Sequence, residues 1–189
     1  MTKFWLRVRR SALELPGDRS GLAAVEFAMI VPLMLVLFFG VNEFSSGVAV
    51  DRKVTLMART LSDLTSQNEK VTDTQLTNFF NASKAIMTPY SATPVNATIS
   101  ELYIDPATKQ ARVQWSKGAA PRTAGTSVSI PAALQIGGTY LIYSEVNYKF
   151  IPTIGYVMAK TGITLSDFTY TRPRQSICVM YNTTVCTTT

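Results

Sequence analysis

The longest run of apolar residues lies near the N-terminus and extends from Leu22 to Val41. All of its residues are apolar or small except Glu26 and Pro32. At about 1.5 Å of rise per residue, a helix of this length reaches about 30 Å, the thickness of a bilayer's hydrocarbon core. The pattern therefore predicts a membrane-spanning helix. A cleaved secretory signal would be shorter and would end in a small-residue cleavage site, which residues 42–44 do not provide.

The apolar pattern continues beyond the predicted span without a helix breaker. Charged residues separate apolar positions that recur at helical spacing as far as Ser66, which is typical of an amphipathic helix. These apolar positions are Val48, Val50, Val54, Leu56, Met57, Leu61 and Leu64. We expect one helix from Leu22 to about Ser66, in which Pro32 removes a single backbone hydrogen bond inside the membrane.

A second, shorter helix is predicted from about Asp73 to Met87. The polar run Thr72–Gln75 precedes its apolar positions, and Pro89 follows as a stop signal. The Phe79–Phe80 pair within it is expected to pack in the core rather than to form a ligand site.

After Pro94 the pattern changes to the two-residue alternation of strands. Residues 95–104 and 110–116 predict a hairpin around a turn at 105–108, and residues 118–129 read as a loop. Residues 139–150 and 163–170 predict two further strands. Together they predict an antiparallel sheet of about four strands beside the helices, so the expected fold class is α+β.

The distribution of charge predicts the orientation of the span. The net charge is +6, but residues 1–21 carry five basic side chains against two acidic ones, which leaves +3 for the rest. Basic residues next to a span favour the cytoplasmic side. We therefore expect a single-pass protein with a cytoplasmic N-terminus and an outward-facing remainder. The basic charge indicates orientation rather than nucleic-acid binding.

The residue inventory argues against catalysis. The chain has no histidine, so Ser-His and Cys-His pairs are excluded. The acids Glu101, Asp105, Glu145 and Asp167 are too dispersed in the sequence to nominate an acid–base pair. No phosphate-binding glycine loop is present, because Gly137 and Gly138 lack a following lysine and helix. We expect no enzymatic activity, no catalytic or metal-binding residues and no cofactor.

Cys178 and Cys186 lie near the C-terminus with seven residues between them. In an oxidising compartment a disulfide is the expected state and would hold the C-terminus in place. Free thiols and a bridge to another subunit are the alternatives.

The residues before the span resemble a type IV prepilin leader. Basic residues precede Gly21, and Glu26 stands five positions after it. The leader residues are Lys3, Arg7, Arg9, Arg10 and Arg19. The resemblance implies cleavage by a prepilin peptidase between Gly21 and Leu22. It also implies that Glu26 neutralises the new N-terminal ammonium of a neighbouring subunit, which would explain a carboxylate in an apolar segment.

The same segment is similar to the core of TadE-like proteins, which are minor pilin or pseudopilin components of the Tad (Flp) pilus machinery. The matching positions are Gly21, Ala24, Glu26, Phe27, Ala28, Pro32, Gly40, Glu43 and Phe44. Residues 145–152 and 170–174 resemble late segments of TadE-like and TadG-like chains. The resemblance implies a role in pilus biogenesis and adhesion at the inner membrane. The implied partners are a prepilin peptidase, other Tad pilus subunits, the inner-membrane platform and membrane lipid.

On this interpretation the chain has three parts. Residues 1–21 are a basic prepilin-like leader, residues 22–66 a transmembrane and stalk helix, and residues 67–189 a periplasmic or extracellular α+β domain. Two alternatives stay open: an uncleaved, TadG-like anchored envelope scaffold, and a surface adhesin or enzyme on a generic anchor. Arg172 and Arg174 are either a site for an acidic partner or lipid head group, or the solvated end of an edge strand.

Overall fold

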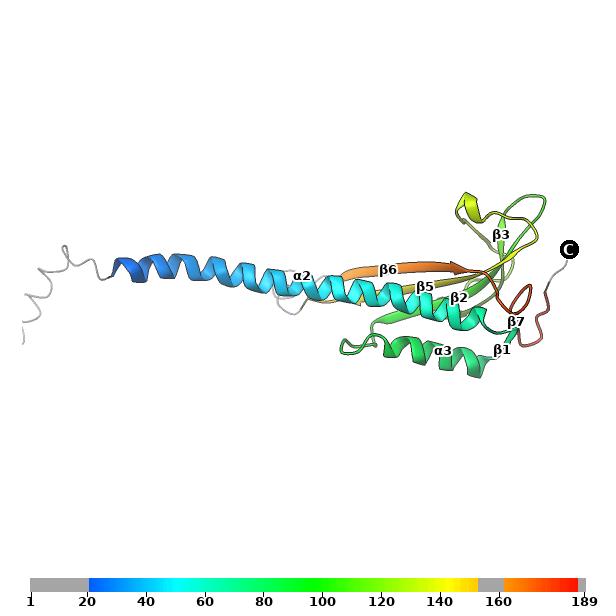
Figure 1. Ribbon diagram of the computed structural model, residues 1–189, viewed down its shortest axis with the longest axis horizontal. Helices are drawn as coiled ribbons and strands as arrows, with labels where there is room; N and C mark the ends of the chain where they lie inside the picture. Colours follow the sequence, from blue (N-terminus) through cyan, green and yellow to red (C-terminus); the bar gives the residue numbers. More distant parts are fainter. Residues whose placement is uncertain (1–20, 153–161, 187–189) are drawn as a thin grey trace, which may run out of the picture. The chain divides into compact units, whose positions relative to one another are not determined.

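The computed structural model describes residues 21–152 and 162–186, so residues 1–20 of the predicted basic leader lie outside the described part. The described residues divide after Phe44 into two compact units, here called the N-terminal unit and the C-terminal unit. The elements along the chain (Figure 1) are α2 (Leu22–Ser66), β1 (Lys70–Val71), α3 (Asp73–Ala85), β2 (Val95–Ile104), β3 (Ala111–Gly118), β4 (Ser127–Val128), the 3-10 helix η2 (Ala132–Leu134), β5 (Tyr140–Phe150), β6 (Ile163–Thr171) and β7 (Met180–Tyr181).

Helix α2 has the predicted bounds and continues through Pro32. Within the C-terminal unit it is amphipathic, with one buried face formed by Val50, Val54, Met57, Ala58 and Leu61. Val48 and Leu56 were predicted to share that face, but they are 39% and 52% exposed. The reason is geometric: at 100° per residue each lies on the opposite side of the helix from the buried positions.

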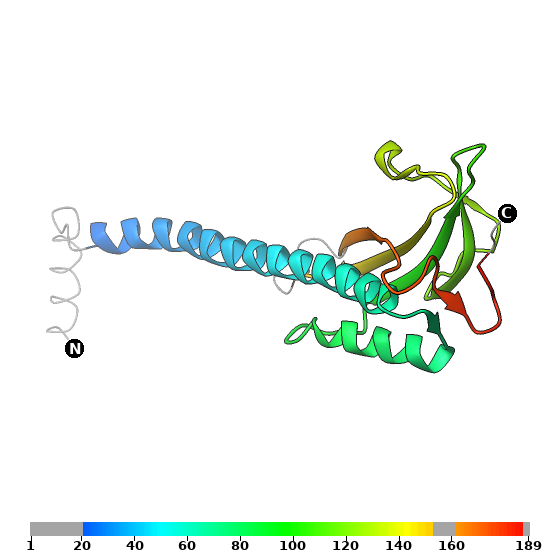
Figure 2. The same cartoon turned by 45° about the vertical axis from the view of Figure 1, so that its right-hand side comes forward.

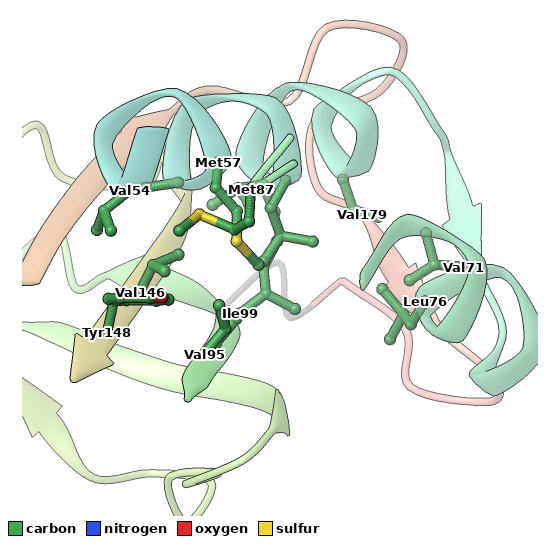
Figure 3. Close-up of a cluster of buried hydrophobic side chains, with 14 of the residues drawn as sticks. Val54, Met57, Val71, Leu76, Met87, Val95, Ile99, Val146, Tyr148 and Val179 are labelled. Atoms are coloured by element: carbon green, nitrogen blue, oxygen red, sulfur yellow. The ribbon is translucent and has the colours of Figure 1, made fainter. Parts of the chain in front are cut away.

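The main core joins α2, α3 and the sheet (Figure 3). Val54 and Met57 of α2 pack in the same buried cluster as Ile99 of β2 and Val146 of β5. The Phe79–Phe80 pair of α3 packs against this cluster, as predicted. Each fully buried side chain of this size contributes about 1.5–3 kcal/mol, so this cluster is the main source of attachment between helix and sheet.

Helix α3 begins with a capping box. The Thr72 hydroxyl accepts a hydrogen bond from the Gln75 N–H at 3.3 Å, and the Gln75 side chain accepts one from the Thr72 N–H at 3.0 Å. The helix ends at Ala85, slightly before the predicted end at Met87. Pro89 cannot continue the hydrogen-bond ladder, and the Met87 N–H donates to Lys84 O at 3.0 Å, so the last turn tightens.

The large sheet has five strands in the order β4-β3-β2-β5-β6, and every neighbouring pair is antiparallel. The predicted hairpin is confirmed as β2–β3, and the Asp105 carboxylate holds its turn by accepting from the Ala107 and Thr108 N–H groups. The predicted loop 118–129 was wrong at both ends, because Gly118 belongs to β3 and the predicted range contains β4. Two residues are too few to show strand alternation, so only pairing with β3 reveals this fifth strand.

A second sheet, which the sequence did not predict, consists of β1 and β7 in parallel. This pairing places the C-terminal residues beside the chain that leaves α2. Strand β6 runs beside the C-terminal part of α2, and α3 lies on the other side of that helix (Figure 1, Figure 2). A long helix packed on a curled five-stranded antiparallel sheet confirms the predicted α+β class.

Candidate functional site

The N-terminal unit exposes apolar side chains on all sides of α2. Large hydrophobic residues from Leu22 to Val41 are exposed, and Phe27 and Met29 reach 69% and 75%. A helix that is apolar all round belongs in a lipid or protein environment. Among the described residues, α2 is the one helix long and apolar enough to cross a membrane, which suggests a single membrane span.

Glu26 lies in the second turn of this apolar segment, and Phe27 follows it on the adjacent side of the helix. No hydrogen bond or ion pair joins the Glu26 side chain to another residue of the described ranges. Side chains of an α-helix point toward its N-terminus, so Glu26 projects over the turn that begins at Leu22. An ionised carboxylate at this place costs on the order of 2.5 kcal/mol or more in lipid unless a cation accompanies it.

Gly21 stands at the start of α2, where its carbonyl accepts a hydrogen bond from the Val25 N–H at 3.1 Å. A Cβ built on Gly21 would meet no atom within 4 Å, and its backbone is outside the positive-φ region that favours glycine. The described fold therefore gives no steric or conformational reason for glycine at this position.

These features define a protein with one candidate membrane-spanning helix joined to an α+β unit. Residues 21–61 match the TadE-like protein family, so the chain carries a TadE-like domain, as its motif predicted. This is consistent with a Tad pilus-associated protein, and the family is a pilin-type family rather than an enzyme family. No curated protein and no solved structure matches the chain.

The structure places the dispersed acids at separate sites. Asp105 holds the β2–β3 turn, Glu145 pairs with Arg122, and Asp167 bonds the Phe168 N–H. Within residues 21–152 and 162–186, no group of three or more cysteine, aspartate or glutamate side chains is arranged to hold a metal ion.

The predicted disulfide is present, and Cys178 and Cys186 have their Cα atoms 5.9 Å apart. It closes the C-terminal strap, our name for residues 172–186. The strap is attached to the end of α2, because the Arg174 N–H donates to Ser66 O at 2.9 Å. The Arg174 guanidinium also pairs with Asp63 at 2.5 Å. Of the two candidate arginines, both of which are exposed, Arg174 therefore has contacts that hold the strap to α2.

Sequence reasoning missed the residue that attaches the middle of the strap. Glu101 of β2 is only 2% exposed, and its carboxylate accepts the Val179 N–H at 2.5 Å. The Trp115 indole N–H donates to Val179 O at 2.8 Å, so two side chains bind both polar groups of one strap residue. Burial raises the pKa of Glu101 to about 8, and the hydrogen bonds from Val179 and Trp115 offset it only in part.

A signal for this site was present in the sequence. Glu101 follows Ala97 and Ile99 at two-residue spacing, so strand alternation puts all three side chains on the same face of β2. A carboxyl on the apolar face of a strand is a buried acid that requires a hydrogen-bond donor.

Proposed function

We propose that this protein is a minor pilin or pseudopilin of a Tad (Flp) type IV pilus system. In this proposal a prepilin peptidase cuts after Gly21, and the mature chain enters the pilus or its assembly complex through α2, supporting pilus biogenesis and adhesion. One observation carries the proposal: a glycine that the fold does not require directly precedes an exposed apolar helix with a carboxylate in its second turn, inside the matched segment.

The geometry supports a role for Glu26 in assembly. Cleavage would create an ammonium group at Leu22, one helical turn, or about 5.4 Å of rise, before Glu26. Both charges are costly in an apolar phase, and each lowers the cost of the other when they approach closely. When α2 docks beside the same helix of another subunit, the carboxylate of one chain neutralises the ammonium of its neighbour. Phe27 adds apolar contact area beside this ion pair.

The proposal includes an orientation and a set of partners. The N-terminal side of the span is cytoplasmic, and the α+β part from residue 67 onward is periplasmic or extracellular, because basic residues precede the span. The partners are the prepilin peptidase, other Tad pilus subunits, the inner-membrane platform and membrane lipid. Nucleic acid is not among them.

Intact-mass measurement of the native protein, extracted from membranes, tests the processing step. We expect the mass of residues 22–189, with Leu22 as the N-terminus, and retention of the leader in a Gly21→Leu variant. Gly40→Leu is the matched control, because Gly40 also has open space at its Cβ position and lies in the same helix. A full-length mass for the native protein would refute processing and would favour the uncleaved, TadG-like scaffold.

A charge substitution tests the assembly step separately. Glu26→Gln keeps the side-chain shape and removes the charge, so we expect normal processing with loss of the protein from sheared pili or from its membrane complex. Asp51→Asn, which neutralises an exposed carboxylate of the same helix in the C-terminal unit, is the control. Unchanged assembly of the Glu26→Gln protein would contradict the proposed ion pair.

A further inference from the structure

A groove lies between the C-terminal part of α2 and strand β6, both within the C-terminal unit. It has a volume of about 360 Å³. Its lining includes Arg59, Asp63 and Leu64 of α2, Thr169 and Thr171 of β6, and Arg174 of the C-terminal strap. The Ser62 hydroxyl donates to the Thr171 hydroxyl at 2.8 Å and fixes the distance between the two walls. The groove is therefore part of the folded unit.

The groove carries an excess of positive charge. Asp63 is its one acid, and both carboxylate oxygens are occupied, one by Arg174 at 2.5 Å and the other by the Gln67 side-chain amide at 2.6 Å. Arg59 is exposed and forms no ion pair with another described residue. Arg52 is also exposed and lies two helical turns earlier on the same face of α2. The nearest acid along β6, Asp167, bonds the Phe168 N–H and does not line the groove.

The other wall of the groove is an open sheet edge. Strand β6 pairs with β5 along its whole length, and no strand of the described ranges pairs with its second side. Backbone N–H and C=O groups on the second side of an edge strand are available to an added strand. Peptide recognition by strand addition uses such groups for affinity and neighbouring side chains for specificity.

We propose that this groove is a docking site for an extended acidic segment of another protein, which adds as a strand along β6 and places carboxylates against Arg59. A peptide satisfies both features at once, because it supplies alternating backbone donors and acceptors together with acidic side chains. A lipid phosphate would satisfy only the arginines. In the sequence, the α2 residues of the groove follow Val41, the end of the apolar segment, by 18 residues or more. This docking site does not depend on processing at Gly21 or on the Glu26 ion pair.

The test uses the detergent-solubilised full-length protein and a labelled peptide of about ten residues with alternating threonine and glutamate. Fluorescence anisotropy should detect binding, and the matched threonine–lysine peptide should not bind. Arg59→Glu should weaken binding about tenfold or more, because it removes a charge-assisted contact and adds repulsion. Arg112→Glu is the control, because Arg112 is an exposed arginine of β3, near the opposite edge of the sheet.

Two further probes keep the outcome decisive. A threonine–glutamate peptide with every second backbone nitrogen methylated keeps its charge but loses its donors, so it should bind at least about tenfold more weakly. Equal binding of this peptide would overturn strand addition. Unchanged binding by the Arg59→Glu variant, or no binding of the unmethylated peptide, would overturn the docking site. Arginine-dependent binding to anionic phosphatidylglycerol vesicles without peptide binding would assign the groove to lipid instead.

Discussion

Neutralising the buried carboxyl of Glu101 should change how the stability of the protein depends on pH. The carboxyl is 2% exposed and receives hydrogen bonds from the strap at Val179 and from Trp115. Desolvation dominates these bonds and raises its pKa from 4.5 to about 8. Glu101→Gln retains an oxygen that can accept the Val179 N–H but has no charge to bury.

The sign and magnitude follow from the raised pKa. Because the pKa is higher in the folded state than in the unfolded state, the contribution of Glu101 to stability is complete below about pH 4.5 and is lost as the pH rises toward 8. A tenfold difference in proton affinity between the two states corresponds to about 1.36 kcal/mol. Between pH 5 and pH 8 the wild-type protein should therefore lose roughly 3–4 kcal/mol relative to the Glu101→Gln variant. For a chain of this size, that difference corresponds to about 7–14 °C in Tm.

Thermal unfolding in detergent, followed by the fluorescence of Trp115, measures this difference. A Trp5→Phe background leaves Trp115 as the sole tryptophan, and this residue contacts the strap directly. Glu69→Gln, which changes an exposed glutamate, is the control and should leave the pH profile of wild type unchanged. If the profiles of wild type and Glu101→Gln run parallel from pH 5 to pH 8, Glu101 ionises as an ordinary carboxyl and the reasoning fails.

Three further perturbations test the C-terminal unit by thermal unfolding. Replacing Cys178 and Cys186 by serine should remove about 2.5 kcal/mol, the chain-entropy value for the short loop they close, and reductant should reproduce the loss in wild type only. Thr72→Ala should lower the free energy of unfolding by about 1 kcal/mol, because it removes the capping box of α3. The control, Thr77→Ala, changes an exposed threonine within α3 and should cost less. Equal losses would contradict a stabilising role of the cap. Gly118→Ala should destabilise the fold by more than about 2 kcal/mol, because Gly118 has a φ of 133° and its Cβ would approach Thr98 Cα to 2.7 Å. The control, Gly47→Ala in α2, should be neutral or stabilising. A Gly118→Ala variant as stable as wild type would contradict the steric reasoning.

The sequence predicted those elements whose signal is local. The bounds of α2 follow from an uninterrupted apolar and then amphipathic run, and the β2–β3 hairpin follows from alternation around Asp105. Strand β4 and the β1–β7 pair were missed, because each has only two residues and exists through pairing with a distant segment. Periodicity carries no information about such partners.

The candidate site residues also divide into those that the local sequence could nominate and those whose role depends on tertiary folding. Glu26 could be nominated because an acid in an apolar run is costly wherever the chain folds. Gly21, Leu22 and Phe27 were nominated from the resemblance of the segment to prepilin leaders and TadE-like proteins. The role of Glu101 could not be predicted from the sequence, because it depends on two residues that folding brings to it. Trp115 of β3 lies opposite Glu101 of β2, and Val179 of the C-terminal strap donates a hydrogen bond to its carboxylate. The ion pair between Asp63 and Arg174 likewise depends on tertiary folding. From charge and residue type alone, Arg172 and Arg174 were equivalent candidates.

The attachment of the C-terminal strap has a consequence for the order of folding. Its bonds join residues far apart along the chain: Val179 to Glu101, Arg174 to Ser66, and Tyr181 to Asp73. Contacts of such long sequence separation form late, since the intervening chain must first be ordered. The strap can bind only after α2, α3 and the sheet have come together. The unit is therefore completed only when the C-terminal strap has bound. A chain cut short before Val179 would leave the carboxyl of Glu101 and the indole of Trp115 exposed to water.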